Sequence, residues 1–180
     1  HGLGGSREGS AYLGRHWAGR GYVVVFLQHP GSDEAVWRDV PPAQRISAMQ
    51  RARNLRNFLL RVKDVAAVLD QLTAWHRAPG HPLNGRLDLA RVGMAGHSFG
   101  AITTQAVSGQ QPRRGQGFQD SRIKAAIVMS PSTPRHYQAS EAFGGVKLPW
   151  LLLTGTHDIA RLMEVNLGGA DLESRLGVFP

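Results

Sequence analysis

Residues 92–101 constrain the fold more than any other part of this 180-residue sequence. The apolar residues 92–95 lead into a Gly-x-Ser-x-Gly pattern centred on Ser98, and Ala-Ile-Thr-Thr-Gln-Ala-Val follows it. The pattern predicts a strand, a sharp turn and a helix, with Ser98 at the apex. Gly96 and Gly100 lack the side chains that would collide where the strand and the helix approach each other. We therefore expect an exposed serine hydroxyl in a nucleophile elbow. The alternative is an ordinary Gly-rich loop.

Three other apolar runs predict further strands, at residues 22–28, 125–129 and 149–154. They show no polar alternation, as expected of strands buried on both faces. Between Pro42 and Trp75 the pattern is helical and long enough for two segments, the second with an apolar stripe through Val62, Val65 and Leu69. Strands that alternate with helices predict an α/β fold. Its sheet should be doubly wound and mostly parallel, with the carboxyl ends of the strands on one rim.

Size, charge and residue usage exclude several classes of protein. The length and the 42% hydrophobic content indicate a single domain, residues 1–180. The net charge of +8 includes six basic residues between Arg45 and Lys63, but leucine, phenylalanine and asparagine separate them. This spacing favours a solvated helix face over an anion-binding surface, and we expect no nucleic-acid partner. The absence of cysteine excludes disulfides and thiolate catalysis, and no apolar run approaches the roughly 20 residues of a membrane span.

The chain begins with a Gly-rich turn, His-Gly-Leu-Gly-Gly, and we expect a helix from a cap at Ser6 to about Trp17. In enzymes that attack acyl groups, such a turn lets bare backbone N–H groups point at a developing oxyanion. The alternative is again an ordinary loop.

Two candidate catalytic side chains follow predicted strands. Ser98 and Asp158 occur in the order nucleophile then acid, and a serine hydroxyl needs a histidine to remove its proton while a carboxylate orients that histidine. Asp158 has an alternative role as the cap of a helix around residues 161–165. His29 also follows a predicted strand, where we expect a hydrogen-bonded structural residue rather than a ligand-facing group.

Together, residues 1–4, 96–100 and 155–158 resemble the α/β-hydrolases of the platelet-activating-factor acetylhydrolase and dienelactone-hydrolase-like group, which includes polyester-cleaving cutinase relatives. The likeness covers the whole chain. It implies that Ser98 is the nucleophile, that Asp158 is the triad acid, and that the backbone N–H groups of Leu3 and Phe99 form the oxyanion hole. It also implies hydrolysis of small-molecule or lipid-like carboxylic esters with short acyl groups, without a metal or an organic cofactor.

The general base departs from this group. There the histidine follows the acid beyond one more strand, yet no histidine follows His157 in this sequence. We therefore expect an internal fragment of a longer serine esterase, truncated at both ends. It would lack the N-terminal strands and the last strand of the sheet, with the base beyond residue 180. Two other interpretations stay open: a non-catalytic binding protein of the same fold, and a nucleic-acid-binding α/β domain that rests on charge alone. The sequence predicts neither the compartment nor the oligomeric state.

Overall fold

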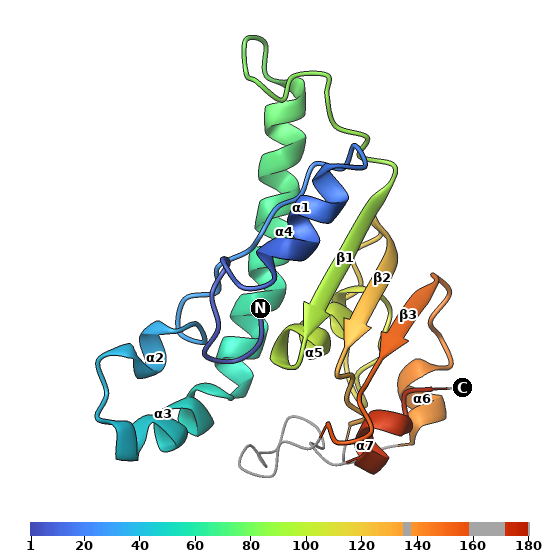
Figure 1. Ribbon diagram of the computed structural model, residues 1–180. Helices are drawn as coiled ribbons and strands as arrows, with labels where there is room; N and C mark the ends of the chain where they lie inside the picture. Colours follow the sequence, from blue (N-terminus) through green and yellow to red (C-terminus); the bar gives the residue numbers. More distant parts are fainter. Residues whose placement is uncertain (135–137, 159–171, 180) are drawn as a thin grey trace.

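The computed structural model describes residues 1–134, 138–158 and 172–179, and it contains one parallel sheet (Figure 1). Its strands are β1 (Val92–His97), β2 (Ile123–Met129) and β3 (Trp150–Leu153), in the order β1-β2-β3. On central β2, Ala126 pairs with Met94 of β1 and with Trp150 of β3. The chain therefore has α/β character with a small parallel sheet, and the strands predicted around residues 92–96, 125–129 and 149–154 are confirmed.

The helices follow the predicted pattern in part. They are α1 (Ala11–Ala18), α2 (Ala35–Arg38), the 3-10 helix η1 (Pro42–Gln44), α3 (Arg45–Ala52), α4 (Leu55–Arg77), α5 (Phe99–Val107), α6 (Ala139–Phe143) and α7 (Leu172–Leu176). The two helical segments expected between Pro42 and Trp75 are confirmed as α3 and α4. The start predicted at Ser6 is wrong, because residues 7–10 form turns and α1 begins only at Ala11. Among the described residues, no helix is both long and apolar enough to span a membrane.

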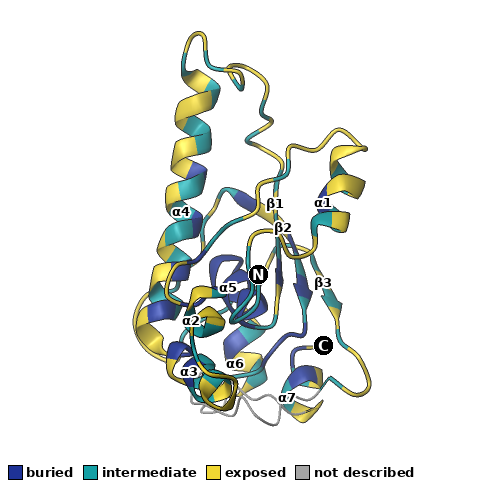
Figure 2. Ribbon diagram, turned by 60° about the vertical axis from the view of Figure 1, so that its left-hand side comes forward, coloured by how far each residue is buried: buried dark blue, intermediate teal, exposed yellow. Residues whose placement is uncertain are grey.

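The core lies where α4 and α5 cover the sheet. One cluster joins Val65 and Leu69 of α4 to Val107 of α5 and Ile123 of β2, and another joins Ala101 of α5 to residues of β2 and β3. In β2, Ile123 belongs to the first cluster and Ala126 and Val128 belong to the second, whereas Lys124 and Ala125 are exposed. Every residue of α5 is buried, whereas much of the outer part of α4 is exposed (Figure 2). The helix that follows Ser98 is therefore buried along its whole length beside the sheet.

The strand predicted at residues 22–28 is wrong. This segment is extended but belongs to no sheet, and Tyr22 and Val23 are 64% and 54% exposed. A strand is stabilised by a ladder of backbone hydrogen bonds to a neighbour. Among the described residues, no strand pairs with this segment, and β1 pairs with β2 alone. Its apolar composition therefore does not produce a strand.

Candidate active site

The turn between β1 and α5 holds Ser98 in a strained conformation. Its φ is 55° and its ψ is −114°, a region that residues with a side chain rarely occupy. A Cβ atom on Gly96 would collide with the Gly100 carbonyl oxygen, and one on Gly100 would lie 2.8 Å from the carbonyl oxygen of His1. Glycine is therefore required at both positions. The predicted strand, sharp turn and helix are confirmed, with Ser98 at the apex.

The N-terminal loop, residues 1–5, lies against this turn. A Cβ atom on Gly2 would lie 3.5 Å from the Cβ of Ser98, so the two backbones are close neighbours. The far end of the loop is fixed by residues 32–37: Gly4 N–H donates to Ser32 O at 2.9 Å, and Trp37 Nε1 donates to Gly4 O at 2.7 Å. The structure thus brings together two of the three sequence motifs, residues 1–4 and residues 96–100.

Three polar groups at this junction have no hydrogen-bond partner among the described residues. They are the hydroxyl of Ser98 and the backbone N–H groups of Leu3 and Phe99. Phe99 is the first residue of α5, so its N–H lies at the positive end of the helix, where no intrahelical acceptor exists. A serine hydroxyl with free N–H donors on adjacent segments is an arrangement that can stabilise an oxyanion.

Asp158 follows β3 and is oriented by two side chains. Thr154 Oγ1 donates to its Oδ2 at 3.1 Å, and the Nε of Arg175 lies 3.6 Å from the same oxygen. Partial desolvation lowers the pKa of His97, and the negative charge of Asp158 opposes that shift. The carboxylate is therefore near enough to the end of β1 to affect the protonation of His97. Residues 161–165, which the alternative role of Asp158 as a helix cap requires, lie outside the described residues.

No described histidine makes a hydrogen bond to Ser98. His29 is only 2% exposed, and its Nδ1 lies 2.8 Å from Asp64 Oδ2, in agreement with a structural role. His157 is exposed and contacts Thr156 Oγ1 at 3.1 Å, while His136 lies outside the described residues. In the described part of the chain, therefore, no histidine is hydrogen-bonded to the serine as a general base would be.

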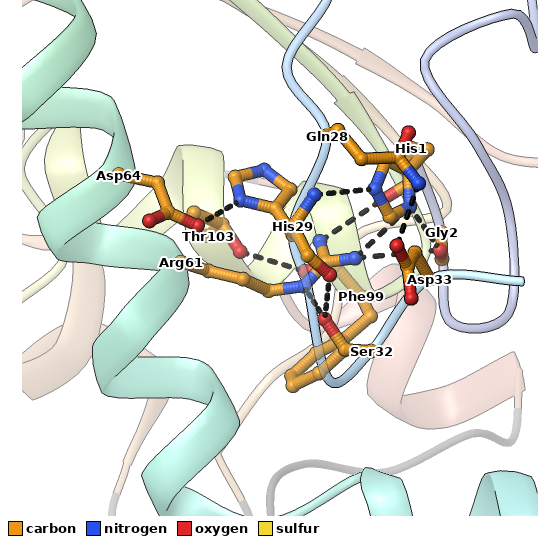
Figure 3. Close-up of polar contacts among 10 residues, drawn as sticks. All are labelled: His1, Gly2, Gln28, His29, Ser32, Asp33, Arg61, Asp64, Phe99 and Thr103. Carbon is orange, nitrogen blue, oxygen red and sulfur yellow. Dashed lines mark hydrogen bonds and ion pairs between the residues drawn. The ribbon is translucent and has the colours of Figure 1, made fainter. Parts of the chain in front are cut away.

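A cluster of buried polar residues lies beneath the N-terminal loop and was missed by the sequence reasoning (Figure 3). It comprises His29, Ser32, Asp33 and Arg61. At its centre is Arg61, which is 0% exposed, so the prediction of a solvated basic face is wrong for this residue. Arg53 is buried as well. The signal was present in the helical spacing, because Asn57, Arg61, Val65 and Leu69 recur every four residues and are the buried residues of α4.

The comparisons with known proteins add no family to this geometry. The chain matches no model of a known protein family, and no curated protein matches it either. Within the described ranges, no group of three or more His, Asp or Glu side chains is arranged to hold a metal ion. Ser98, the N-terminal loop and Asp158 are therefore the features from which a function can be inferred.

Proposed function

We propose that this chain carries the nucleophile, the oxyanion hole and the triad acid of a serine esterase with an α/β-hydrolase fold and a doubly wound sheet. The strained backbone of Ser98, next to the unpaired N–H groups of Leu3 and Phe99, carries the proposal. The parallel sheet, with Ser98 after β1 and Asp158 after β3, supports it.

In the proposed reaction, the Ser98 hydroxyl attacks the ester carbonyl while a general base removes its proton. The carbonyl oxygen becomes an oxyanion that accepts hydrogen bonds from Leu3 and Phe99. The base then donates the proton to the departing alcohol. In the second half, water attacks the acyl-serine while the base removes its proton, and that proton passes to the Ser98 oxygen as the carboxylic acid leaves. Asp158 orients the base, which comes from outside the described residues. The substrate class, a carboxylic ester with a short acyl group, follows from the resemblance described above.

The test is ester hydrolysis by the full-length gene product. Ser98→Ala removes only the attacking oxygen, so p-nitrophenyl acetate turnover should fall by about 10⁴- to 10⁶-fold while the fold is kept. A fluorophosphonate should label Ser98 in the wild-type protein. Ser121→Ala, at an exposed position next to β2, is the matched control and should change neither result. Near-normal turnover by Ser98→Ala would show that Ser98 is not the nucleophile.

A second arm of the same experiment concerns Asp158. Asp158→Asn keeps the size of the side chain but holds the partner histidine in the wrong tautomer, which costs about 10⁴-fold in the analogous protease. The loss should not exceed that of Ser98→Ala. Turnover within a few-fold of wild type would remove Asp158 from the triad.

A non-catalytic binding protein of the same fold is the second candidate, and one observation favours it: no described histidine makes a hydrogen bond to Ser98. This candidate predicts that the full-length gene product neither hydrolyses p-nitrophenyl acetate nor reacts with the fluorophosphonate. Stoichiometric labelling of Ser98 excludes it.

A further inference from the structure

Arg61 contacts Gly2, which precedes one proposed oxyanion-hole donor, and the side chain of Phe99, which carries the other (Figure 3). Its Nη1 donates to His1 O at 2.9 Å, its Nη2 donates to Gly2 O at 3.4 Å, and its Nε donates to Ser32 Oγ at 2.8 Å. The guanidinium carbon also lies 4.6 Å from the centre of the Phe99 ring. One side chain thus joins the N-terminal loop, the segment at Ser32 and the start of α5.

The burial of this guanidinium is costly. Although burial lowers the pKa of Arg61 to about 10, the group stays protonated at neutral pH. No carboxylate of the described residues lies within ion-pair distance of it, although the charges of Asp64 and Asp33 favour its protonated form; its hydrogen-bond acceptors are two backbone carbonyls and a hydroxyl. A buried charge with this environment costs several kcal/mol of desolvation, which an apolar side chain of similar size avoids. Such a side chain would also leave two carbonyls and a hydroxyl without their donor, so the reason for an arginine here lies in the groups that it binds.

The imidazole of His1 shows which hydrogen bonds hold the loop. His29 N–H donates to His1 Nε2 at 3.1 Å, so this nitrogen accepts and the neutral ring carries its proton on Nδ1. His1 Nδ1 then donates to Gly2 O at 2.8 Å. The 3.2 Å approach of Arg61 Nη2 to His1 Nδ1 is accordingly a contact between two donors, and Nη2 bonds Gly2 O instead.

The carbonyl oxygen of Gly2 consequently accepts from three donors: His1 Nδ1, Arg61 Nη2 and, at 3.2 Å, the backbone N–H of Gly5. Because a trans peptide is planar, the C=O of Gly2 and the N–H of Leu3 point in opposite directions. Holding the carbonyl toward Arg61 therefore directs the Leu3 N–H away from it. Arg61 also packs on the ring of Phe99, whose N–H is the other donor.

We propose that Arg61 is a positioning residue that sets the direction of one oxyanion-hole donor, the Leu3 N–H, through the Gly2 peptide, while it packs against the side chain of Phe99, the residue that carries the other donor. This inference rests on the proposed esterase function. Oxyanion stabilisation depends on N–H donors that already point in the right direction before the reaction, and the proposal gives a buried arginine this orienting role.

The test compares Arg61→Met with Arg56→Met in the full-length gene product. Arg56 is exposed on the same helix and should be neutral. Arg61→Met should lower kcat for p-nitrophenyl acetate on the order of 10- to 100-fold, less than the loss of a whole donor, with KM within about threefold. Arg61→Lys keeps the charge but not the planar fork, and should recover only part of the loss.

A thionoester of the same alcohol supplies a readout that a merely structural role would not move. Sulfur is a weaker acceptor on a longer bond, so an intact oxyanion hole favours the oxygen ester. The ratio of kcat/KM for ester over thionoester should fall by at least about fivefold in Arg61→Met. If that variant does not fold, Ser32→Ala takes its place. It removes the acceptor of the Arg61 Nε and a longer hydrogen bond from Ser32 Oγ to His29 O, and the ratio should fall in the same direction.

The failures of the two proposals are distinguishable. A wild-type protein that neither turns over the ester nor is labelled at Ser98 contradicts the esterase function. The role of Arg61 alone is overturned if the wild-type protein is active and labelled at Ser98 but the folded Arg61→Met variant keeps kcat within about threefold and the same ester-to-thionoester ratio. The same criterion applies to Ser32→Ala where that variant is used.

Discussion

His29 is a buried titratable side chain next to Arg61 and the N-terminal loop. Its burial, followed by the charge of Arg61, lowers its pKa from 6.5 to about 3, so the ring is neutral in the folded protein. Below pH 6.5 the unfolded chain takes up a proton on this residue that the folded chain does not. Stability is therefore lost as the pH falls from 6.5 toward 3, by up to about 1.4 kcal/mol per pH unit.

The expected result is a loss of up to about 2 kcal/mol in the free energy of unfolding between pH 7 and pH 5, measured by urea denaturation. Burial raises the pKa of Asp64, which acts in the opposite direction at lower pH. His29→Asn keeps an amide that can donate to Asp64 but does not titrate, so its unfolding free energy should change less over this range. Identical slopes for the two proteins would show that His29 is protonated in the folded state.

At the scale of elements, the sequence predicted β1, β2, β3, α4 and α5 because each carries a periodic or continuous apolar pattern, and residues of each belong to the two core clusters. Residues 22–28 carry the same pattern without the same outcome. The composition of a segment indicates that it favours a sheet. A strand also needs a neighbouring strand to pair with, and the tertiary structure decides whether one is present. The start of α1 was misplaced because Ser6 resembles a cap, whereas a turn precedes Ser10.

The candidate site was predicted unevenly for a related reason. Ser98 and its glycines belong to one local pattern, so their geometry could be read from the sequence. Arg61 reaches His1 across most of the N-terminal third of the chain, and such a contact has no local signal beyond the spacing of four in α4. Arg175 is a second buried arginine of this kind, in the short helix α7.

Arg175 fixes α7 to the loop that follows β2. Its Nη1 lies 2.8 Å from the carbonyl oxygens of Ser130 and Pro131 and 2.9 Å from Ser132 Oγ. Arg175→Met leaves these buried acceptors without a charged donor, so the free energy of unfolding should fall by about 3 kcal/mol. Urea denaturation measures the change. Glu173→Gln on the exposed side of the same helix is the control. A loss below about 0.5 kcal/mol in Arg175→Met would mean that these hydrogen bonds do not anchor α7.

At the scale of the whole molecule, exposed apolar side chains lie on an edge strand of the sheet and on the segment of residues 22–28. Within the ranges that the structure describes, β1 and β3 are the edges of the sheet, and residues Leu151 and Leu153 of β3 are exposed. The extended residues 22–28 present Tyr22, Val23 and Val25 to solvent. Unpaired strand edges next to exposed β-branched and aromatic side chains are templates for association between copies.

We therefore expect the chain of residues 1–180, expressed alone, to self-associate as its concentration rises. Val23→Lys combined with Val25→Lys places charges on the exposed segment and should reduce the association, as followed by light scattering and by the sedimentation of the protein. Tyr12→Lys is the matched control, because Tyr12 is also exposed but lies on α1, where the backbone is already hydrogen-bonded within the helix. Association that the double variant and the control reduce equally would reflect net charge rather than the extended segment. A wild-type chain that stays monomeric and melts cooperatively at high concentration would show that residues 22–28 and the sheet edges are not available for pairing.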